Sequence, residues 1–488
     1  MKLYSEKAER FSAAGKDAAV FFATKETVLG CSEPSILSAH KQLVECGAFD
    51  CKENNLYSFR MGLAGQEKLT LVVLIGAGEE PQSPQPRKVR DAMGKTAKLL
   101  EKEKAASAAV LFPESFGKKE VAKGGEGLLL GSYSFDDYRS EKKEKICKEI
   151  TLYSNSGAAL DTANVLAAAI CQTRDLVNLT TWDLHPADLA KKAKKAGEKY
   201  GFEVEVFKPE EIEELGMAAF MAVGQGSANT PRLIVMRYRG NPESEEVLGF
   251  IGKGLCYDSG GYSMKPSTGM ETMKSDMAGA AAVIGAMGAI AQKKLKVNVT
   301  AVAAACENMV SGNSYRPGDV ISSMSGKTIE VDNTDAEGRL TLADAITYTI
   351  RKEKATKLVD IATLTGAAVV ALGGEITAAV CDNDELWNKA EAAAAKGCEK
   401  IWRMPCDMDL NKNLDSKIAD MKNTGERGGG CITAGLFLKR FTEGLPWLHL
   451  DIAGPSYTKN GNDVCAFGGT GCGVATLYYL AKAFEAER

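Results

Sequence analysis

The segment Ile251-Gly-Lys-Gly-Leu-Cys-Tyr-Asp-Ser-Gly-Gly-Tyr-Ser-Met-Lys-Pro266 is a short apolar stretch that leads directly into a glycine-rich loop. Its first half is typical of a buried strand, and the pair Gly260–Gly261 lets the backbone turn closely around whatever the loop encloses. Lys253, Asp258 and Lys265 are charged residues among neighbours that are otherwise apolar or small. A strand followed by a solvated turn explains any one of these charges, but it explains all three together less well.

Similar apolar stretches alternate with helical patterns on both sides of this segment. We predict further strands in the C-terminal two-thirds at 202–208, 232–239, 247–252, 297–305, 358–363 and 447–452. The intervening helices are expected at 279–294, 336–352 and 431–441. This pattern predicts a mixed sheet flanked by helices, with the active site at the carboxyl ends of its strands.

The length of 488 residues exceeds the ~250–300 at which single cores stop growing, so more than one domain is expected. The first residues also alternate, with strands predicted at 17–23, 69–77 and 106–112 and a helix at 89–104. We therefore predict an α/β protein of two domains: a smaller N-terminal α/β domain at 1–155, a linking helix within 156–180 that starts near Ala158, and a larger catalytic domain at 181–488.

Composition is that of an ordinary globular protein, with a formal net charge of −4. This balance gives no reason to expect a nucleic acid partner. The charged N-terminus does not resemble a secretory signal and no apolar run is long enough for a membrane span, so we expect a cytoplasmic protein without membrane association. The thirteen cysteines are odd in number and lack a Cys-x-x-Cys pair, which favours reduced thiols such as Cys256, Cys306 and Cys381 in the core.

Two further segments carry clustered acidic residues. Asp276 stands just before an apolar run, where an Asp is often only a helix N-cap. Asp335 and Glu337 are two residues apart, so in an extended segment their carboxylates point the same way, and Arg339 continues that spacing. A capping box ahead of a helix explains one of these carboxylates, but not their density beside an Arg.

Asp258, Asp276, Asp335 and Glu337 together offer four carboxylates. Drawn into one place they would repel one another strongly unless cations intervened. Two divalent ions ~3.5–4 Å apart are the usual solution, and they suit hydrolysis because they activate water and polarise a carbonyl. Oxygen ligands of this kind fit Zn, Mn, Mg or Co.

The octapeptide Asn333-Thr-Asp-Ala-Glu-Gly-Arg-Leu340 resembles the signature of the leucyl aminopeptidase family of cytosolic two-metal peptidases. Lys253, Asp258, Lys265 and Asp276 match the rest of that family's site in order and spacing. The resemblance extends through Thr363-Leu-Thr-Gly366, the stretch 428–434 and His449-Leu-Asp-Ile-Ala-Gly454, and it covers roughly residues 174–480.

This resemblance implies a role for each matching residue. Asp258 and Glu337 are expected to bridge two divalent ions, Zn or Mn, with Lys253 and Asp276 completing the tighter site and Asp335 the more exchangeable one. Lys265 is expected to polarise the scissile carbonyl, and Arg339 to hold a bicarbonate that acts as general base. Substrate contacts are expected from Met273, Asn333, Thr363, Leu364, Gly366 and Ala453.

The resemblance further implies a hydrolase, a metalloprotease that removes N-terminal Leu and other apolar residues from peptides with a metal-activated water. It also implies a homohexamer. Cys256-Tyr257 and Asn178-Leu-Thr-Thr depart from the family's usual residues, but neither departure touches a ligand.

Other functions are less consistent with the sequence. Two-metal phosphoester hydrolysis also uses carboxylates, but Lys253 and the absence of clustered histidines argue against it. An accessory DNA-binding role, known in some bacterial relatives, has no support in the charge balance. The stretch Gly468-Gly-Thr-Gly-Cys-Gly473 is too near the C-terminus for a nucleotide-binding βαβ unit, so we interpret it as a turn into a helix.

Overall fold

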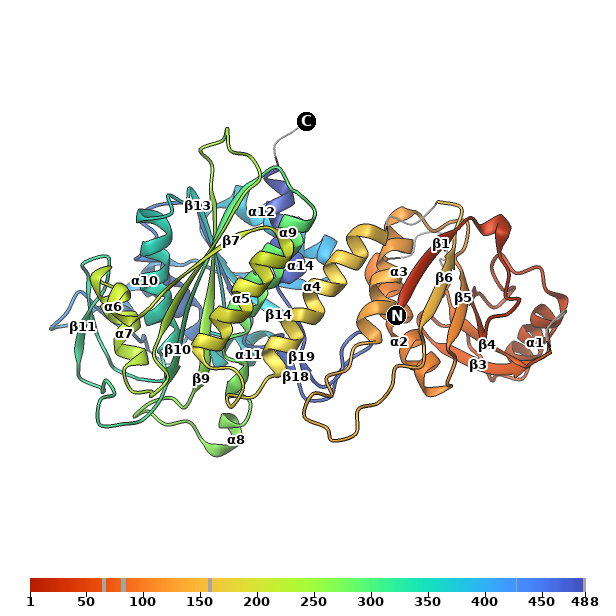
Figure 1. Cartoon of the computed structure of the whole chain (residues 1–488), viewed down its shortest axis with the longest axis horizontal. Helices are drawn as coiled ribbons and strands as arrows, with labels where there is room; N and C mark the ends of the chain where they lie inside the picture. The colour runs from red at the N-terminus through yellow and green to blue at the C-terminus, as the bar shows by residue number, and fades with distance from the viewer. Residues whose placement is uncertain (64–66, 80–84, 157–159, 427, 486–488) are drawn as a thin grey trace. The chain divides into compact units, whose positions relative to one another are not determined.

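The computed structural model describes residues 1–63, 67–79, 85–156, 160–426 and 428–485. They form two compact units, one of Met1–Ala168 with Asn460–Phe467, the other of Ala169–Lys459 with Gly468–Arg488 (Figure 1). The predicted catalytic domain, 181–488, includes the short segment Asn460–Phe467. It joins the first unit because Lys98 donates a hydrogen bond to the carbonyl of Cys465 over 3.1 Å.

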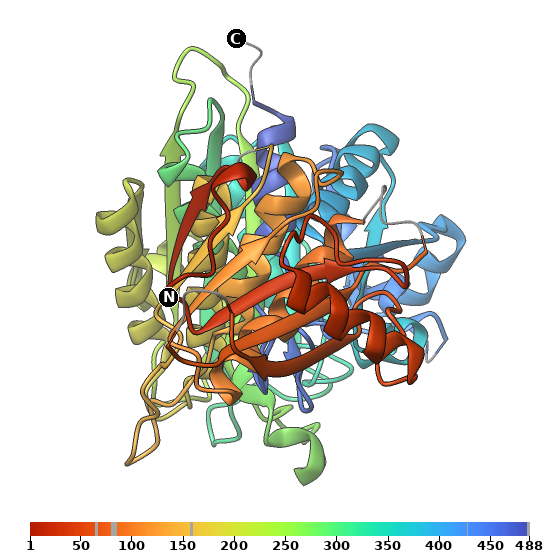
Figure 2. The same cartoon turned by 90° about the vertical axis from the view of Figure 1, so that its right-hand side faces the viewer.

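The first unit is built on a six-stranded sheet in the order β1-β6-β5-β2-β4-β3, parallel except for β3 (Figure 2). Successive residues of β2 point to opposite faces, so Val20 and Phe22 pack with residues of α2 and α3, whereas Phe21 packs with Ile36 of α1. The elements are β1 (Lys2–Glu6), β2 (Ala18–Ala23), α1 (Pro34–Glu45), β3 (Leu56–Met61), β4 (Thr70–Gly76), α2 (Pro86–Lys102), β5 (Ser107–Leu111), α3 (Lys118–Gly131) and β6 (Glu149–Tyr153).

The helix α4 (Leu160–Asn178) has residues in both units. Its length agrees with the predicted linking helix, although Ala158 lies outside the described residues.

The second unit is built on an eight-stranded mixed sheet in the order β15-β14-β17-β13-β9-β10-β8-β7. Its central strands, β13, β9 and β10, run parallel and are almost wholly buried, which explains their continuous apolar sequences. The strands are β7 (Glu203–Phe207), β8 (Arg232–Arg239), β9 (Leu248–Asp258), β10 (Asn298–Asn308), β13 (Lys357–Ala362), β14 (Ile376–Cys381), β15 (Lys400–Met404) and β17 (Trp447–Asp451). A small sheet contains β11 (Val320–Ser322), β12 (Thr328–Glu330) and β16 (Met421–Lys422), and a two-stranded sheet pairs β18 (Tyr457–Thr458) with β19 (Gly468–Gly469).

Helices cover both faces of the large sheet (Figure 1). α10 and α7 pack against β9 and β10 on one face, and α9 and α5 pack on the other. The helices are α5 (Pro186–Tyr200), α6 (Pro209–Glu214), α7 (Ala218–Gly224), α8 (Ser267–Met270), α9 (Ala278–Gln292), α10 (Gly338–Arg351), α11 (Gly366–Leu372), α12 (Asp384–Gly397), α13 (Gly430–Lys439) and α14 (Val474–Ala483), with a 3-10 turn η2 (Met273–Ser275) before α9.

The predicted mixed sheet flanked by helices is therefore confirmed, as is the two-domain α/β class. The stretch 468–473 forms β19 and the turn into α14, as predicted. Cys256, Cys306 and Cys381 are buried free thiols, in agreement with their predicted place in the core. Among the described residues, no helix combines the length and apolar character needed to cross a membrane.

Candidate metal centre

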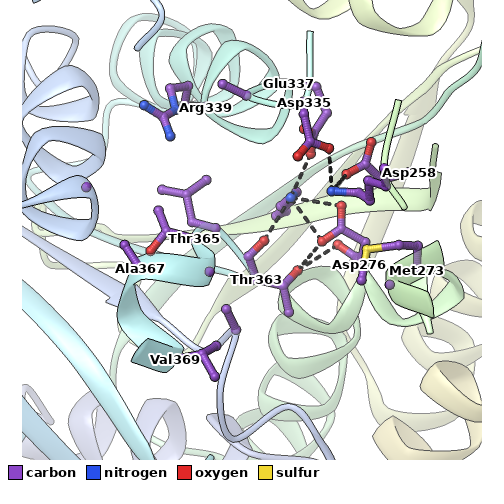
Figure 3. A pocket seen from close by; sticks show the side chains of 18 of the residues that line it. Asp258, Met273, Asp276, Asp335, Glu337, Arg339, Thr363, Thr365, Ala367 and Val369 are labelled. Carbon is purple, nitrogen blue, oxygen red and sulfur yellow. Dashed lines mark hydrogen bonds and ion pairs between the residues drawn. The ribbon is translucent and has the colours of Figure 1, made fainter. Parts of the chain in front are cut away.

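Acidic and basic side chains from three separate segments converge at the carboxyl end of β9 (Figure 3). Lys253 and Asp258 come from β9, Asp276 directly follows η2, and Asp335 and Glu337 precede α10. Carboxylate oxygens of Asp258, Asp335 and Glu337 lie within 4.8 Å of one another, a spacing that could hold a metal ion. The structure thus brings together all five residues predicted as metal ligands.

An irregularity in β9 places its two charged residues on one side. The pairing of β9 with β10 shifts register between Cys306 and Glu307, so that Leu255 is opposite Cys306 and Tyr257 is opposite Glu307. One extra residue on β9 reverses the alternation of side chains beyond it. Asp258 therefore reaches the same side as Lys253, although they are five residues apart and regular alternation would separate them.

The ammonium group of Lys253 lies among three polar partners. Its Nζ is 3.0 Å from Oδ1 of Asp276, 2.8 Å from Oε1 of Glu337 and 2.8 Å from the carbonyl of Thr363. Gly338 leaves room for this side chain, because a Cβ at that position would lie 2.4 Å from Cε of Lys253. Burial would lower the pKa of Lys253, but the surrounding carboxylates raise it above its ordinary value.

Lys265 forms a second cationic contact. Its Nζ is 2.8 Å from Oδ2 of Asp258 and also contacts the carboxylate of Asp335. Burial would lower the pKa of Lys265, but Asp258 and the other carboxylates raise it. Burial in turn raises the pKa of Asp258 to about 6, and Glu337 adds to that rise.

The residues present fit divalent cations. Asp276 Oδ2, Asp335 Oδ1 and Glu337 Oε1 are buried and accept no well-directed hydrogen bond; each meets only a lysine ammonium group. A buried carboxylate oxygen without a hydrogen-bond donor is costly unless a cation approaches it. The four carboxylates outnumber the two ammonium groups, and hard oxygen donors suit Mn, Mg or Zn.

Simple helix capping does not explain these acidic residues. α9 begins at Ala278 with Met277 as its N-cap, and the Asp276 carboxylate accepts hydrogen bonds from Lys253 and Thr363 instead. Glu337 is the N-cap residue of α10, but its side chain accepts no capping hydrogen bond.

Arg339 corrects one detail of the sequence analysis. It does not continue an extended segment, because α10 already begins at Gly338 and Arg339 lies in its first turn. In Figure 3 it stands apart from the carboxylates, at the other end of the cavity wall. Its Nη1 donates to the carbonyl of Asn423 over 2.8 Å, and its buried Nε has no hydrogen-bond partner among the described residues. Burial lowers the pKa of Arg339 to about 10.

A cavity of about 740 Å³ opens beside these groups. Its walls include Arg339, Lys265 and all six residues predicted to contact substrate: Met273, Asn333, Thr363, Leu364, Gly366 and Ala453. Not all of them are free to bind a ligand. The hydroxyl of Thr363 donates to Oδ1 of Asp276 over 2.7 Å, and Oδ1 of Asn333 accepts from the backbone of Asp335 over 2.8 Å. These two side chains therefore also position the acidic residues.

Comparison with known proteins agrees with this arrangement. The sequence pattern of the cytosol aminopeptidase family, catalytic domain, matches residues 171–478, and that of the N-terminal domain of the same family matches residues 36–142. The chain belongs to the cytosol aminopeptidase family.

Several bacterial members of this family are similar to the chain over most of their length. A probable cytosol aminopeptidase of Clostridium perfringens is 50% identical over 426 residues, which cover 84% of this chain and 86% of the relative. One from Alkaliphilus oremlandii is 41% identical and covers 91% of each chain. Among solved structures, the bottromycin maturation enzyme BotP in complex with Mn is 30% identical, with a TM-score of 0.86 over 96% of this chain and 100% of that one. As a member of the cytosol aminopeptidase family, the chain is a metal-dependent aminopeptidase.

Two buried residues that support the centre of this aminopeptidase were not predicted from the sequence. Asn308 Nδ2 donates to Oδ1 of Asp258 over 2.8 Å. Asp451 accepts hydrogen bonds from the backbone of Leu364 and Ala453, both over 3.1 Å, and so shapes one cavity wall. Asn308 follows a strongly apolar strand, and this position at a strand end was the one available signal.

Proposed function

We propose that this aminopeptidase removes N-terminal Leu and other apolar residues from peptides, with two divalent ions, Zn or Mn, held by Lys253, Asp258, Asp276, Asp335 and Glu337. The observation that carries the proposal is the convergence of these five side chains beside a cavity lined by Lys265 and Arg339. Among the described residues, the buried oxygens Asp276 Oδ2, Asp335 Oδ1 and Glu337 Oε1 contact only lysine ammonium groups. The Mn complex of BotP, which shares the fold, supports the choice of ions.

Each ligand has a distinct place in the proposal. As the family resemblance implies, Asp258 and Glu337 would be shared between the two ions. Lys253 and Asp276 would complete one site, and Asp335 the other, with its backbone carbonyl included. Two bound divalent ions supply Lewis acidity that activates water and polarises a carbonyl.

The remaining charged residues would act on the substrate. Lys265, once its carboxylate partners are compensated by metal, can direct its ammonium group at the scissile carbonyl oxygen and stabilise negative charge that develops there. Arg339 has an unpartnered Nε and lines the cavity, so it can hold a bicarbonate ion near the reacting water. A bicarbonate held there would supply a general base near the substrate.

The cavity supports an apolar preference. Met273, Leu364, Gly366 and Ala453 offer apolar or small surface beside the acidic cluster. Such a pocket separates aliphatic side chains by only ~1–3 kcal/mol, so a broad specificity centred on Leu is expected. We further propose a cytoplasmic homohexamer, whose test is a sedimentation mass equal to six copies of the 52.0 kDa chain.

A panel of aminoacyl amides tests the reaction and the preference together. The metal-free protein should be inactive, and Zn or Mn should restore activity with Leu-amide hydrolysed fastest. A phosphate monoester serves as the control substrate and should not be turned over. A strong preference for Asp- or Lys-initiated substrates would overturn the assignment of the pocket, and activity without any metal would overturn the assignment of the centre.

A further inference from the structure

The segment from Asp332 to Glu337 carries two of the proposed ligands but belongs to no helix or strand. It links β12, which ends at Glu330, to α10, which begins at Gly338. Such a segment keeps one conformation only if other groups satisfy its backbone N–H and C=O groups. The side chain of Asn423, which directly follows β16, lies against this segment and is fully buried.

Both ends of the Asn423 amide are used. Its Oδ1 accepts from the backbone N–H of Asp332 over 2.8 Å and of Asn333 over 3.3 Å. Its Nδ2 donates to the carbonyl of Asn333 over 2.7 Å and of Ala336 over 3.4 Å. The side chain therefore spans the segment from its first residue to the residue just before Glu337.

The chemistry of these contacts selects an amide. One end meets only N–H donors and the other meets only C=O acceptors, and asparagine has both functions on one short side chain. Aspartate would keep the acceptor end but would place a carboxylate oxygen against two carbonyl oxygens. Alanine would remove the hydrogen-bond partner of four backbone groups at once.

The backbone of Asn423 extends the same connection. Its N–H donates to the carbonyl of Glu330 over 2.9 Å, which continues the parallel pairing of β16 with β12. Its carbonyl accepts from Nη1 of Arg339 over 2.8 Å. One residue thus contacts the ligand segment through its side chain and the proposed anion-binding arginine through its main chain.

We propose that Asn423 is a positioning residue of the metal centre, which fixes the ligand segment so that Asp335 and Glu337 face Asp258. This inference rests on the proposed two-metal function. Its consequence is selective. In the proposed centre, the site completed by Asp335 takes Asp335 and Glu337 from this segment and only Asp258 from β9, whereas the site of Lys253 and Asp276 takes only Glu337 from the segment.

Metal binding to the full-length protein is the direct test. Asn423→Asp and Asn423→Ala are compared with wild type by equilibrium dialysis against Mn²⁺, with metal counted per chain. Loss of such a supporting contact typically weakens metal affinity by ~10–100-fold. We expect the weaker of the two ions to lose affinity by that factor while the tighter ion is retained, and we expect kcat to recover in part when Mn²⁺ is raised. Asn423→Ser, which is smaller and uncharged, replaces either variant that does not fold.

Asn298 provides a matched control. Like Asn423, it is a buried asparagine of the second unit. It is the first residue of β10, whose last residue is Asn308, and its Nδ2 donates to the carbonyls of Asn241 over 2.7 Å and Ser244 over 2.9 Å. Asn298→Asp should lower the thermal stability as Asn423→Asp does, but it should leave both metal affinities and kcat unchanged.

The outcomes separate the two proposals. If wild type binds two ions and the Asn423 variants bind both as tightly, Asn423 only stabilises the fold and the inference is overturned. The same holds if Asn298→Asp weakens metal binding equally. If wild type itself binds no divalent ion, the proposed function fails, and the positioning role fails with it.

Discussion

The charge state of Lys253 links protonation to metal binding. In the structure its ammonium group compensates Asp276 and Glu337, and the carboxylates hold its pKa above the ordinary value despite burial. An ammonium group has no lone pair, so coordination of a metal requires loss of that proton. An arriving divalent ion takes over the compensation of the carboxylates and favours this loss.

Replacing Lys253 therefore tests its role as a ligand. Lys253→Ala should weaken one of the two metal sites by about ten-fold or more and affect the Asp335 site less. Wild-type affinity at this site should rise with pH, because binding releases a proton. Metal content is measured between about pH 6 and 9, a range that spans the ~7 typical of metal-bound water. Lys327→Ala, a half-buried lysine away from the cavity, is the control. Equal metal retention by wild type and Lys253→Ala throughout that range would rule out the ligand role.

Lys265 and Arg339 should matter for the reaction but not for metal retention. Lys265→Ala removes a cation that contacts Asp258 and Asp335, so metal affinity should hold or increase. Its kcat should fall by about 10²–10³-fold, the usual effect of removing a group that stabilises a developing oxyanion. Arg339→Ala should also lower kcat with two ions still bound. Kinetics and metal analysis on the same samples check both variants, and loss of metal from either would assign that residue to the ligand set or to structural support.

At the scale of elements, the start of α10 must lie close to β9. Alanine normally exceeds glycine in helix propensity by ~1 kcal/mol. At Gly338, however, a Cβ would lie 2.4 Å from Cε of Lys253, and overpacking costs ~1–3 kcal/mol. Gly338→Ala should therefore be destabilising and should displace Lys253 from its partners.

Thermal unfolding and metal content show whether overpacking at Gly338 outweighs the higher helix propensity of alanine. Gly338→Ala should lower both the melting temperature and the metal bound at the Lys253 site. Gly269→Ala in α8 is the control, since a Cβ there meets nothing within 4 Å. A Gly338→Ala protein as stable as wild type would mean that the helix moves away without cost.

Asp344 of α10 makes the stability of the folded protein depend on pH. Its fully buried carboxylate accepts from the backbone of Met324 over 2.8 Å and of Phe220 over 2.9 Å. Burial raises the pKa of Asp344 to about 7, although these hydrogen bonds favour the charged form. The folded state therefore holds this proton more tightly than the unfolded state, whose Asp pKa is ~3.9. The resulting stability is fully present below about pH 4 and is lost as the pH rises towards 7.

Asp344→Asn removes this titration. The free energy of unfolding of the variant relative to wild type should rise between about pH 4 and 7, by at most a few kcal/mol, and level off above that range. Urea unfolding at a series of pH values measures the difference, and the carboxylates of the metal centre cancel because both proteins share them. A difference that does not change with pH would contradict the shifted pKa.

At the scale of the whole molecule, metal ions should stabilise one unit and not the other. All proposed ligands belong to the second unit, which also contains the four tryptophans Trp182, Trp387, Trp402 and Trp447. Tryptophan fluorescence therefore reports the unfolding of that unit alone, whereas circular dichroism reports both units.

Metal removal should lower the midpoint of the unfolding transition that is measured by tryptophan fluorescence. A ligand present at 100–1,000 times its Kd stabilises the folded state by ~3–4 kcal/mol. A chelator that removes the metal ions removes this stabilisation. The circular dichroism signal of the first unit should keep its midpoint, and added Mn²⁺ or Zn²⁺ should restore the fluorescence midpoint. Equal fluorescence transitions with and without chelator would contradict metal binding in the second unit.

The local elements and the kinds of residue in the candidate site could be predicted from the sequence. Apolar runs predicted the central strands β9, β10 and β13, and helical spacing predicted α9 and α10, because burial leaves its periodicity in the residues of each element. The ligand types were visible for a similar reason: charges in an apolar neighbourhood need a partner. The family resemblance then gave each of these residues an expected role.

The way in which these residues meet could not be predicted, because it depends on contacts between segments that are distant along the chain. The register shift in β9 turns Asp258 to the side of Lys253, and it depends on pairing with β10 rather than on the sequence of β9. Asn423 and Asp451 hold the cavity walls from segments that are remote along the chain. A single polar residue carries no periodic signal in the sequence. The hydrogen bonds that define its structural role form only when distant segments of the chain pack together.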